Sequence, residues 1–468
     1  MHTKKIRKGK EKETLKNKLF AQTAIALLFI SIFTALPLAV APTFARVSVG
    51  DVEAYQLSNT FETSGAYPPG KTFKDFAGGI VAFDQDMIDV EQIAHPQNKW
   101  YGKDIHVAVL DTGMLPNWNY FFPKPRIEAD LGIGFVQDLE TGEITTVPWD
   151  DAVSGHGTHV TSTIIGYNYH GYPITGVAPL AKIIPVKVLS FYDYVAQSAW
   201  GTSGMVAAGI DYITSLVEDG TLEAGKVIIN MSLGGSGPAS DIEEAIDRAI
   251  AAGVIVVAAA GNGGTDGMDW PGAYPQVISA AAAGWTGQWH PDGYYDFWLE
   301  DVPEDLMTPA PLSIYFGAYA GTQTYITYYS AWELEGQDLD VAAPGSWCLG
   351  PYWTPAAGEL PEDPEDCYWY VGGTSMAAPH VAGTAALLAE KKGRKLTQTE
   401  MEIILESTAE IDPLTFVNGG WLGPLPYMAI YELYDANYYW TEWDDPAVGA
   451  GLLQTDAAVE AVAALGPH

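Results

Sequence analysis

Basic side chains are scarce in this sequence. Its 468 residues include 23 lysines and arginines against 58 aspartates and glutamates, so the formal net charge is -35. Eight of the basic residues lie within residues 1–45, which leaves the remainder even more acidic. Nucleic acids and anionic membranes repel such an acidic chain. We therefore expect neither as a partner of the residues that follow residue 45. The acidic surface favours solubility in salt, and binding of divalent cations is the alternative use of this charge.

Cysteine is nearly absent. The chain has two, Cys348 and Cys367, in a short segment rich in proline and acidic residues. A disulfide suits an exported protein, and it would hold a segment that otherwise has little to stabilise it. Two unrelated thiols are the alternative, and we predict the disulfide.

The amino terminus combines a basic start with an uncharged apolar run, Leu19–Val40. This order is typical of an export signal, and Thr43-Phe44-Ala45 offers a small-x-small site for cleavage after Ala45. The run is also long enough to span a bilayer uncleaved, with the basic flank in the cytoplasm. We therefore predict that residues 1–45 are a signal peptide or a membrane anchor, and that the protein is extracellular or at the cell surface.

Buried strands and helices alternate along the rest of the chain, in which hydrophobic residues are plentiful (48% of the sequence). Apolar runs typical of parallel strands occur at 105–113, 181–189, 226–235, 253–262 and 276–283. Helical patterns lie between them at 156–166, 201–220 and 239–253. This alternation predicts a mainly parallel sheet with helices on both faces, a three-layer α/β/α domain whose active site lies at the carboxyl ends of the strands.

The domain boundaries follow from shifts in composition. We assign residues 46–100 to an N-terminal extension, with a possible short pro-segment and the start of the mature domain, and residues 101–468 to one large domain. An aromatic, acidic and proline-rich stretch at about 284–328 interrupts the pattern and is interpreted as an insertion.

Three short motifs carry the residues of a catalytic triad. Asp111 follows a buried strand in VAVLDTGM, His156 opens an apolar helix in SGHGTHV, and Ser375 opens a helix of small residues in GGTSMAAPHVAG. A serine hydroxyl becomes a good nucleophile only when a base takes its proton, and a buried carboxylate orients a histidine for that role. Asn262, in AAAGNGG, can add an amide donor for an oxyanion, beside the backbone N–H of Ser375. Singly each residue has an ordinary structural role, but the ordered set indicates acyl transfer.

Five ordered blocks resemble those of subtilisin-like serine peptidases: VLDTG, HGTHV, NMSLGG, AAAGN and GTSMAAPHVAG. The resemblance spans about residues 103–463. It implies a serine endopeptidase with Asp111, His156 and Ser375 as triad, and with Asn262 and the Ser375 N–H as the oxyanion hole. It also implies that Ser232-Leu233-Gly234 pairs with the substrate backbone, with Gly201–Gly204 as the opposite edge.

The same resemblance sets expectations for partners and cofactors. Polypeptides are the expected substrates, the protein is expected to be a monomer, and no catalytic cofactor is implied. Family members often hold structural Ca²⁺ after the histidine helix, but here residues 166–175 offer no carboxylate, so that site is doubtful. Acidic pairs such as Glu300-Asp301 and Glu362-Asp363 can serve instead, and no metal ligands are assigned. Too few residues precede the domain for a full prodomain, so we expect a short pro-segment or none.

One departure from the family concerns specificity. In GNGGTDGMDWPGAYP, Asp269 aligns near the base of the primary specificity pocket, where many relatives have a small residue. A carboxylate there would favour lysine or arginine on the acyl side of the cut. The alternative is that Asp269 faces solvent or binds a cation. His159 and His380 lie on the motif helices and are expected to be structural.

Other functions fit the motifs less well. An α/β-hydrolase esterase needs a G-x-S-x-G elbow and the chain order Ser, acid, His, and this chain has neither around Ser375. An acid peptidase of the sedolisin type lacks the histidine base that His156 supplies, so we expect activity to rise as His156 loses its proton near neutral pH. A catalytically silent binding protein would be marked by a broken triad.

Overall fold

The computed structural model describes residues 46–48, 53–56, 73–90, 100–285, 324–327, 329–392, 395–410, 416–418 and 445–464. The predicted signal peptide or anchor, residues 1–45, lies outside these ranges, as does most of the predicted insertion. No helix within the described ranges is long and apolar enough to cross a membrane.

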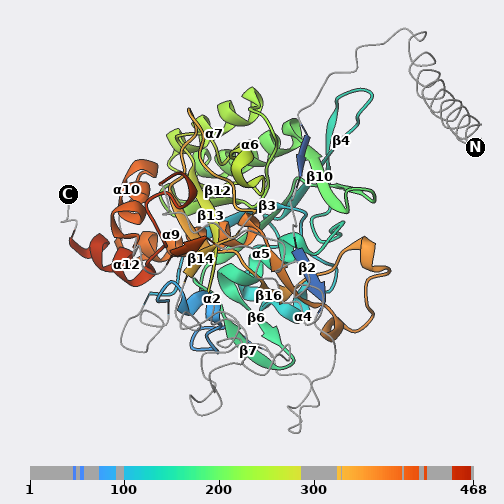
Figure 1. Cartoon of the computed structure of the whole chain (residues 1–468). Coiled ribbons are helices and arrows are strands. Elements are labelled where there is room, and N and C mark those ends of the chain that lie inside the picture. Colours follow the sequence, from blue (N-terminus) through green and yellow to red (C-terminus); the bar gives the residue numbers. More distant parts are fainter. Residues whose placement is uncertain are drawn as a thin grey trace, which may run out of the picture. The chain divides into compact units, whose positions relative to one another are not determined.

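A central sheet organises the described part of the chain, where ten strands join it (Figure 1). In spatial order these are β18 (Phe416–Asn418), β14 (Thr324–Ile326), β13 (Ile278–Trp285), β12 (Ile255–Ala259), β11 (Val227–Met231), β3 (His106–Asp111), β8 (Lys182–Lys187), β4 (Ile133–Gln137) and β5 (Ile144–Val147), with β15 (Val341–Pro344) also paired to β13. The pairings are parallel except β13 with β14 and β4 with β5. The mainly parallel sheet confirms the prediction.

Helices cover both faces of this sheet. They are α5 (His156–Ile165), α6 (Ser203–Glu218), α7 (Ser240–Ala252), α9 (Thr374–Lys392), α10 (Gln398–Thr408) and α12 (Thr455–Ala464). Strand β3 shows the division, because Ala108 and Leu110 belong to the core with α6 and α7. Val107 and Val109 belong to the other core, with α5, α9, α10 and α12. Alternate side chains of a strand point to opposite faces, so the fold is the predicted three-layer α/β/α sandwich.

Smaller elements surround the sheet. Three small sheets contain β1 (Arg46–Ser48), β10 (Ser198–Thr202) and β9 (Phe191–Asp193); β16 (Cys348–Pro351), β17 (Tyr368–Gly372) and β2 (Glu53–Gln56); and β6 (Gly166–Tyr169) with β7 (Tyr172–Thr175). The short helices are α2 (Phe83–Asp86), α4 (Trp118–Phe121) and the 3₁₀ turns η1 (Lys124–Arg126), η2 (Gly264–Asp266), η5 (Pro355–Ala357), η6 (Pro364–Asp366) and η7 (Asp445–Ala447).

The sequence sets several helix ends directly. The Thr202 hydroxyl accepts a hydrogen bond from the Met205 N–H at 3.2 Å and caps α6. Gly253 ends α7 with a φ of 88°, a left-handed conformation that glycine adopts without strain. Thr397 and Glu400 form a capping box at the start of α10.

The predicted disulfide is wrong. Cys348 is paired with Val371 in the β16–β17 hairpin, whereas Cys367 immediately precedes Tyr368, the first residue of β17, which is paired with Pro351. Four residues of strand separate the two positions, about 13 Å at the usual rise, and a disulfide requires Cα atoms within about 7 Å. Both cysteines are free and buried. The hairpin ladder, rather than a covalent bridge, holds this segment.

The two ends of the predicted insertion lie side by side. Gly284 and Trp285 at the end of β13 are paired antiparallel with Tyr325 and Thr324 of β14. Residues 286–323 lie outside the described ranges, and the domain boundaries of the sequence analysis remain predictions.

Helix α9 leaves no room for larger side chains at Gly383. A Cβ at this position would lie 2.6 Å from Cβ of Val177. We expect Gly383→Ala to lower the free energy of unfolding by about 1–3 kcal/mol because the core must shift to accept the methyl group. Chemical denaturation measures the change. Gly237→Ala, with no atom within 4 Å of its added Cβ, is the matched control and should change stability little. Equal losses for both variants would contradict tight packing at Gly383.

Candidate active site

Asp111 and His156 form a buried pair at the carboxyl end of the sheet. Asp111 is the last residue of β3, and His156 is the first residue of α5. The His156 Nδ1 lies 2.8 Å from Oδ1 and 2.9 Å from Oδ2 of Asp111, and both side chains are fully buried. Gly157 permits this approach, because a Cβ there would lie 2.4 Å from the Gly113 carbonyl oxygen. The carboxylate therefore orients the ring, and water does not compete for it.

Ser375 lies in the first turn of α9, tied to the segment that follows β11. Its hydroxyl donates to the Ser232 carbonyl oxygen at 3.1 Å, and the Ser232 hydroxyl donates to the Ser375 carbonyl oxygen at 2.7 Å. The side-chain amide of Asn230 donates to the Ser232 hydroxyl at 3.0 Å. These bonds fix the backbone of Ser375 relative to the sheet. To give its proton to a base, the Ser375 hydroxyl must release this hydrogen bond to Ser232.

The orientation of Asn262 follows from its contacts with Thr374. Its Oδ1 accepts from the Thr374 N–H at 2.9 Å and from the Thr374 hydroxyl at 3.1 Å. The Thr374 hydroxyl also accepts from the Gly261 N–H at 3.1 Å. Two donors require the oxygen on this side, so the amide NH₂ points the other way.

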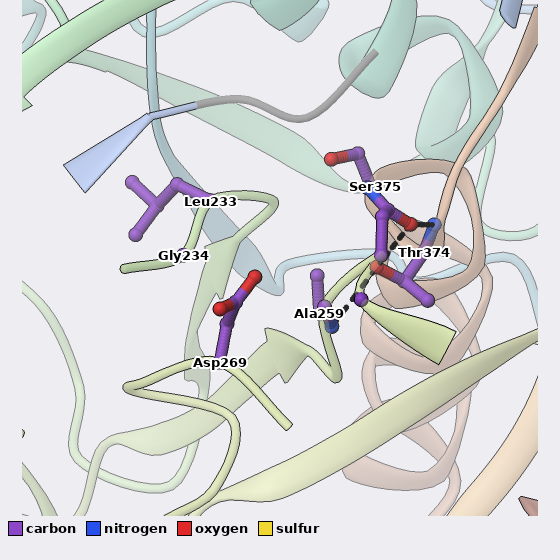
Figure 2. A pocket seen from close by; sticks show the side chains of 9 residues that line it. Leu233, Gly234, Ala259, Asp269, Thr374 and Ser375 are labelled. Atoms are coloured by element: carbon purple, nitrogen blue, oxygen red, sulfur yellow. Dashed lines mark hydrogen bonds between the residues drawn. The ribbon is translucent and has the colours of Figure 1, made fainter. Parts of the chain in front are cut away.

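A pocket of about 270 Å³ joins several of the predicted site residues (Figure 2). It is lined by Leu233, Gly234, Ala259, Gly261, Asn262, Gly263, Asp269, Thr374 and Ser375. Figure 2 shows Asp269 across the pocket from Ser375, below Leu233 and Gly234. The pocket thus gathers residues from three of the five motif blocks, together with Asp269.

Asp269 is held in the wall of this pocket. A Cβ at Gly234 would lie 2.7 Å from the Asp269 Cβ, and a Cβ at Gly261 would lie 2.8 Å from its Oδ2, so two glycines make room for the carboxylate. Gly235 and Trp270 exchange backbone hydrogen bonds of 2.9 Å and join the two walls. Burial raises the pKa of Asp269, and a hydrogen bond from the Asn262 backbone opposes that rise. The sequence analysis missed the role of the two glycines, because their neighbour is distant in sequence.

The predicted second substrate edge is shorter than expected. Gly201 and Thr202 end strand β10, but α6 already begins at Ser203. The second half of the stretch Gly201–Gly204 is therefore helical, because Thr202 acts as the helix cap.

His159 and His380 lie in the core of the two motif helices. His159 Nε2 is 3.0 Å from the Cys348 carbonyl oxygen, and His380 Nδ1 is 2.8 Å from the Met376 carbonyl oxygen. His380 Nε2 also lies 3.4 Å from Oδ2 of the buried Asp84 in α2. The sequence analysis did not find Asp84, which lies in an acidic stretch with no motif.

The loop after α5 does not fit Ca²⁺. Residues 166–175 form the β6–β7 hairpin, and Asn168 is used within the protein. Its Oδ1 accepts from the Gly171 N–H at 2.9 Å, and its NH₂ donates to the Tyr120 carbonyl oxygen at 3.3 Å. Asp363 likewise accepts from the Glu365 N–H at 3.0 Å, and Glu300-Asp301 lies outside the described residues.

A separate cluster, Asp340 with Glu402 and Glu406, brings three carboxylates within 4.8 Å. Burial raises the pKa of Asp340 well above its usual range, and its Oδ2 accepts hydrogen bonds from the Ser279 N–H at 2.8 Å and the Ser279 hydroxyl at 2.7 Å.

The subtilase family model matches residues 102–441, most of the chain. This chain belongs to the subtilase family. It is 28% identical over 312 residues to subtilisin DY of Bacillus licheniformis, a match that covers 66% of this chain and 84% of that protein. It is 30% identical over 312 residues to the major intracellular serine protease of Bacillus subtilis (strain 168), covering 64% of this chain and 74% of the relative. The subtilase is accordingly a serine-type endopeptidase.

Solved structures share the fold. Fervidolysin from Fervidobacterium pennivorans, described as a keratinolytic enzyme related to subtilisin, aligns with a TM-score of 0.55 and 24% identity over 90% of this chain and 51% of its own. The S41 psychrophilic protease aligns with a TM-score of 0.51 and 21% identity over 82% of this chain and 99% of its own. The subtilase therefore has the architecture of that family.

The environment of His159 predicts a pH dependence of stability. Burial lowers its pKa from 6.5 to about 3, so the folded protein keeps the ring neutral while the unfolded chain takes up a proton below pH 6.5. Stability must therefore fall as the pH drops from about 6.5 toward 3, by at most about 1.4 kcal/mol per pH unit for this one proton. We expect His159→Gln to flatten the pH dependence of the unfolding free energy, measured by chemical denaturation. Thr161→Val, a near-isosteric change at a buried, non-titrating position of the same helix, is the control and should leave the slope as it is. An unchanged slope in His159→Gln would contradict the assignment.

Proposed function

We propose that this subtilase is an exported endopeptidase, secreted or held at the cell surface, with Ser375 as nucleophile. His156 is its general base and acid, and Asp111 orients His156. The observation that carries this proposal is the fully buried Asp111–His156 pair, with both carboxylate oxygens within 2.9 Å of Nδ1. This arrangement leaves Nε2 as the ring nitrogen that exchanges protons, as the mechanism requires.

The reaction proceeds by acyl transfer. The Ser375 hydroxyl turns from Ser232 and attacks the peptide carbonyl while His156 takes its proton. The Asp111 carboxylate stabilises the resulting imidazolium. The Asn262 NH₂ and the Ser375 N–H donate to the oxyanion, the latter from a helix amino terminus whose dipole favours negative charge. His156 then protonates the leaving amine, and water hydrolyses the acyl-enzyme by the same steps in reverse.

Leu233 and Gly234 are proposed to bind the substrate backbone beside the pocket. Their support is that they line the same pocket as Ser375 and Asn262. Polypeptides are the proposed substrates and a monomer the proposed state. Export is supported by the basic start and the apolar run Leu19–Val40.

Active-site labelling tests the assignment of the nucleophile. A fluorophosphonate probe should label the full chain but not its Ser375→Ala variant, because only an activated serine reacts at a useful rate. Ser215→Ala is the control, since this exposed serine of α6 is bonded only to its own helix, at the Tyr212 carbonyl oxygen. Labelling that persists in Ser375→Ala would refute the assignment. No labelling of the folded wild type would instead support a silent binding protein or a protein that is still unprocessed.

We further propose that Asp269 gives the pocket a preference for lysine or arginine at the acyl side of the cut. Its carboxylate faces the pocket without a lysine or arginine partner among the described residues. A buried carboxylate facing a bound cation forms a strong charge-assisted hydrogen bond.

The Asp269 proposal predicts a substrate ratio and its pH dependence. The ratio of kcat/KM for Arg- over Phe-ending anilides should fall about tenfold or more in Asp269→Asn, because the charge is lost while the size is kept. Asp266→Asn, in the same loop but exposed, is the control. Because burial raises the pKa of Asp269, the wild-type ratio should also decline on acidification at a higher pH than an ordinary aspartate would give. A strong wild-type preference for Phe would refute the proposal.

A further inference from the structure

A segment of the chain itself lies along the predicted substrate edge. Strand β1 is paired antiparallel with β10, and Arg46, Val47 and Ser48 are opposite Thr202, Gly201 and Trp200 (the dark-blue strand beside β10 in Figure 1). On its other side β1 approaches the segment that follows β11, because a Cβ at Gly235 would lie 2.8 Å from the Arg46 carbonyl oxygen. Residues 46–48 therefore occupy the space between the two edges to which a peptide substrate was assigned.

The next described strand of the chain, β2, lies close to Ser375, the proposed nucleophile, in the sheet pairing. Downstream, β2 is paired antiparallel with β17, and Glu53 lies opposite Gly372, three residues before Ser375. Between 46 and 56 the chain thus passes from the β10 side to the β17 side, and residues 49–52 lie outside the described ranges. A peptide that follows the same course as residues 46–56 has the positions of β1 on the amino-terminal side of the positions nearest Ser375.

Two side chains anchor β1 to this path. Val47 is buried in the core that includes Leu233 and Ala199. The Arg46 guanidinium lies outside the core, where its Nη2 is 3.0 Å from Asp193 Oδ2 and its Cζ is 4.8 Å from the centroid of the Trp200 ring. The guanidinium is therefore held by a carboxylate and by an aromatic face at the same time.

Both partners of Arg46 are positioned by the β9–β10 hairpin. Asp193 Oδ1 accepts from the Val195 N–H at 2.9 Å and from the Ala196 N–H at 3.0 Å, so the turn orients the carboxylate. These backbone hydrogen bonds, together with Arg46, lower the pKa of Asp193. Trp200 lies opposite Phe191 across the ladder, with ring centroids 4.7 Å apart. A cation arriving here finds its two partners already in place, and it does not have to order two mobile side chains.

We propose that Asp193 and Trp200 form a subsite for an arginine or lysine side chain of a bound peptide, on the amino-terminal side of the scissile bond. The inference rests on the proposed peptidase function, and the subsite is separate from the pocket that contains Asp269. The contact is partly exposed, so we expect a gain of about three- to tenfold in peptide affinity over a neutral side chain.

Binding and cleavage test the subsite separately. Fluorescent peptides carry one arginine, moved position by position through an otherwise neutral sequence, and each has a twin with neutral citrulline. Binding to the full-length Ser375→Ala protein is measured by anisotropy, and cleavage by the full-length wild type gives kcat/KM. One position should show the arginine gain in both measurements. Residues 46–48 compete with every peptide and lower all affinities by the same factor. This factor cancels in the ratio of the arginine peptide's affinity to that of its citrulline twin.

Asp193→Asn should abolish most of this gain, since an amide keeps an oxygen for the turn but loses the charge. Asp138→Asn is the matched control: Asp138 accepts from the Glu140 and Thr141 N–H groups at 2.8 Å in the β4–β5 hairpin and contacts no cation. Equal binding of arginine and citrulline peptides at every position, or a gain that survives in Asp193→Asn, would overturn the subsite. Arginine-selective binding without any cleavage would retain the subsite and overturn the proposed function.

Discussion

The burial of α9 is the constraint on which the rest of the structure depends. Every residue of this helix from Thr374 to Ala389 is buried, and most of its side chains are small, so the strands approach it closely. Its amino terminus is tied to the sheet by the reciprocal hydrogen bonds between Ser232 and Ser375. The position of Ser375, the proposed nucleophile, therefore follows from core packing.

Three pairs of buried polar groups lie near this helix. Asp111 faces His156, Asp84 faces His380, and the hydroxyls of Thr384 and Thr455 are 2.9 Å apart. Pairing is required because an isolated polar group in a dry core is costly. In the case of His156, the same pairing sets the tautomer needed for proton transfer.

Acidic charge has two roles in this protein. Spread over the surface, the net charge of -35 repels polyanions and attracts cationic peptides at long range. In the two proposals made above, acidic charge at Asp193 and Asp269 also provides local partners for basic side chains of a substrate. The proposed specificity is therefore consistent with the composition of the whole chain.

The sequence by itself determined the three-layer fold, the order of the motifs and the family, because apolar periodicity and short contiguous motifs are local properties. It could not determine that Cys348 and Cys367 lie apart, since strand register depends on pairing across a hairpin. Nor could it predict the contact of Asp84 with His380, the glycines that make room for Asp269, or the contacts of Arg46 with Asp193 and Trp200. These depend on contacts between residues distant in the chain, such as Arg46 with Asp193, and only the packed tertiary structure brings such residues together.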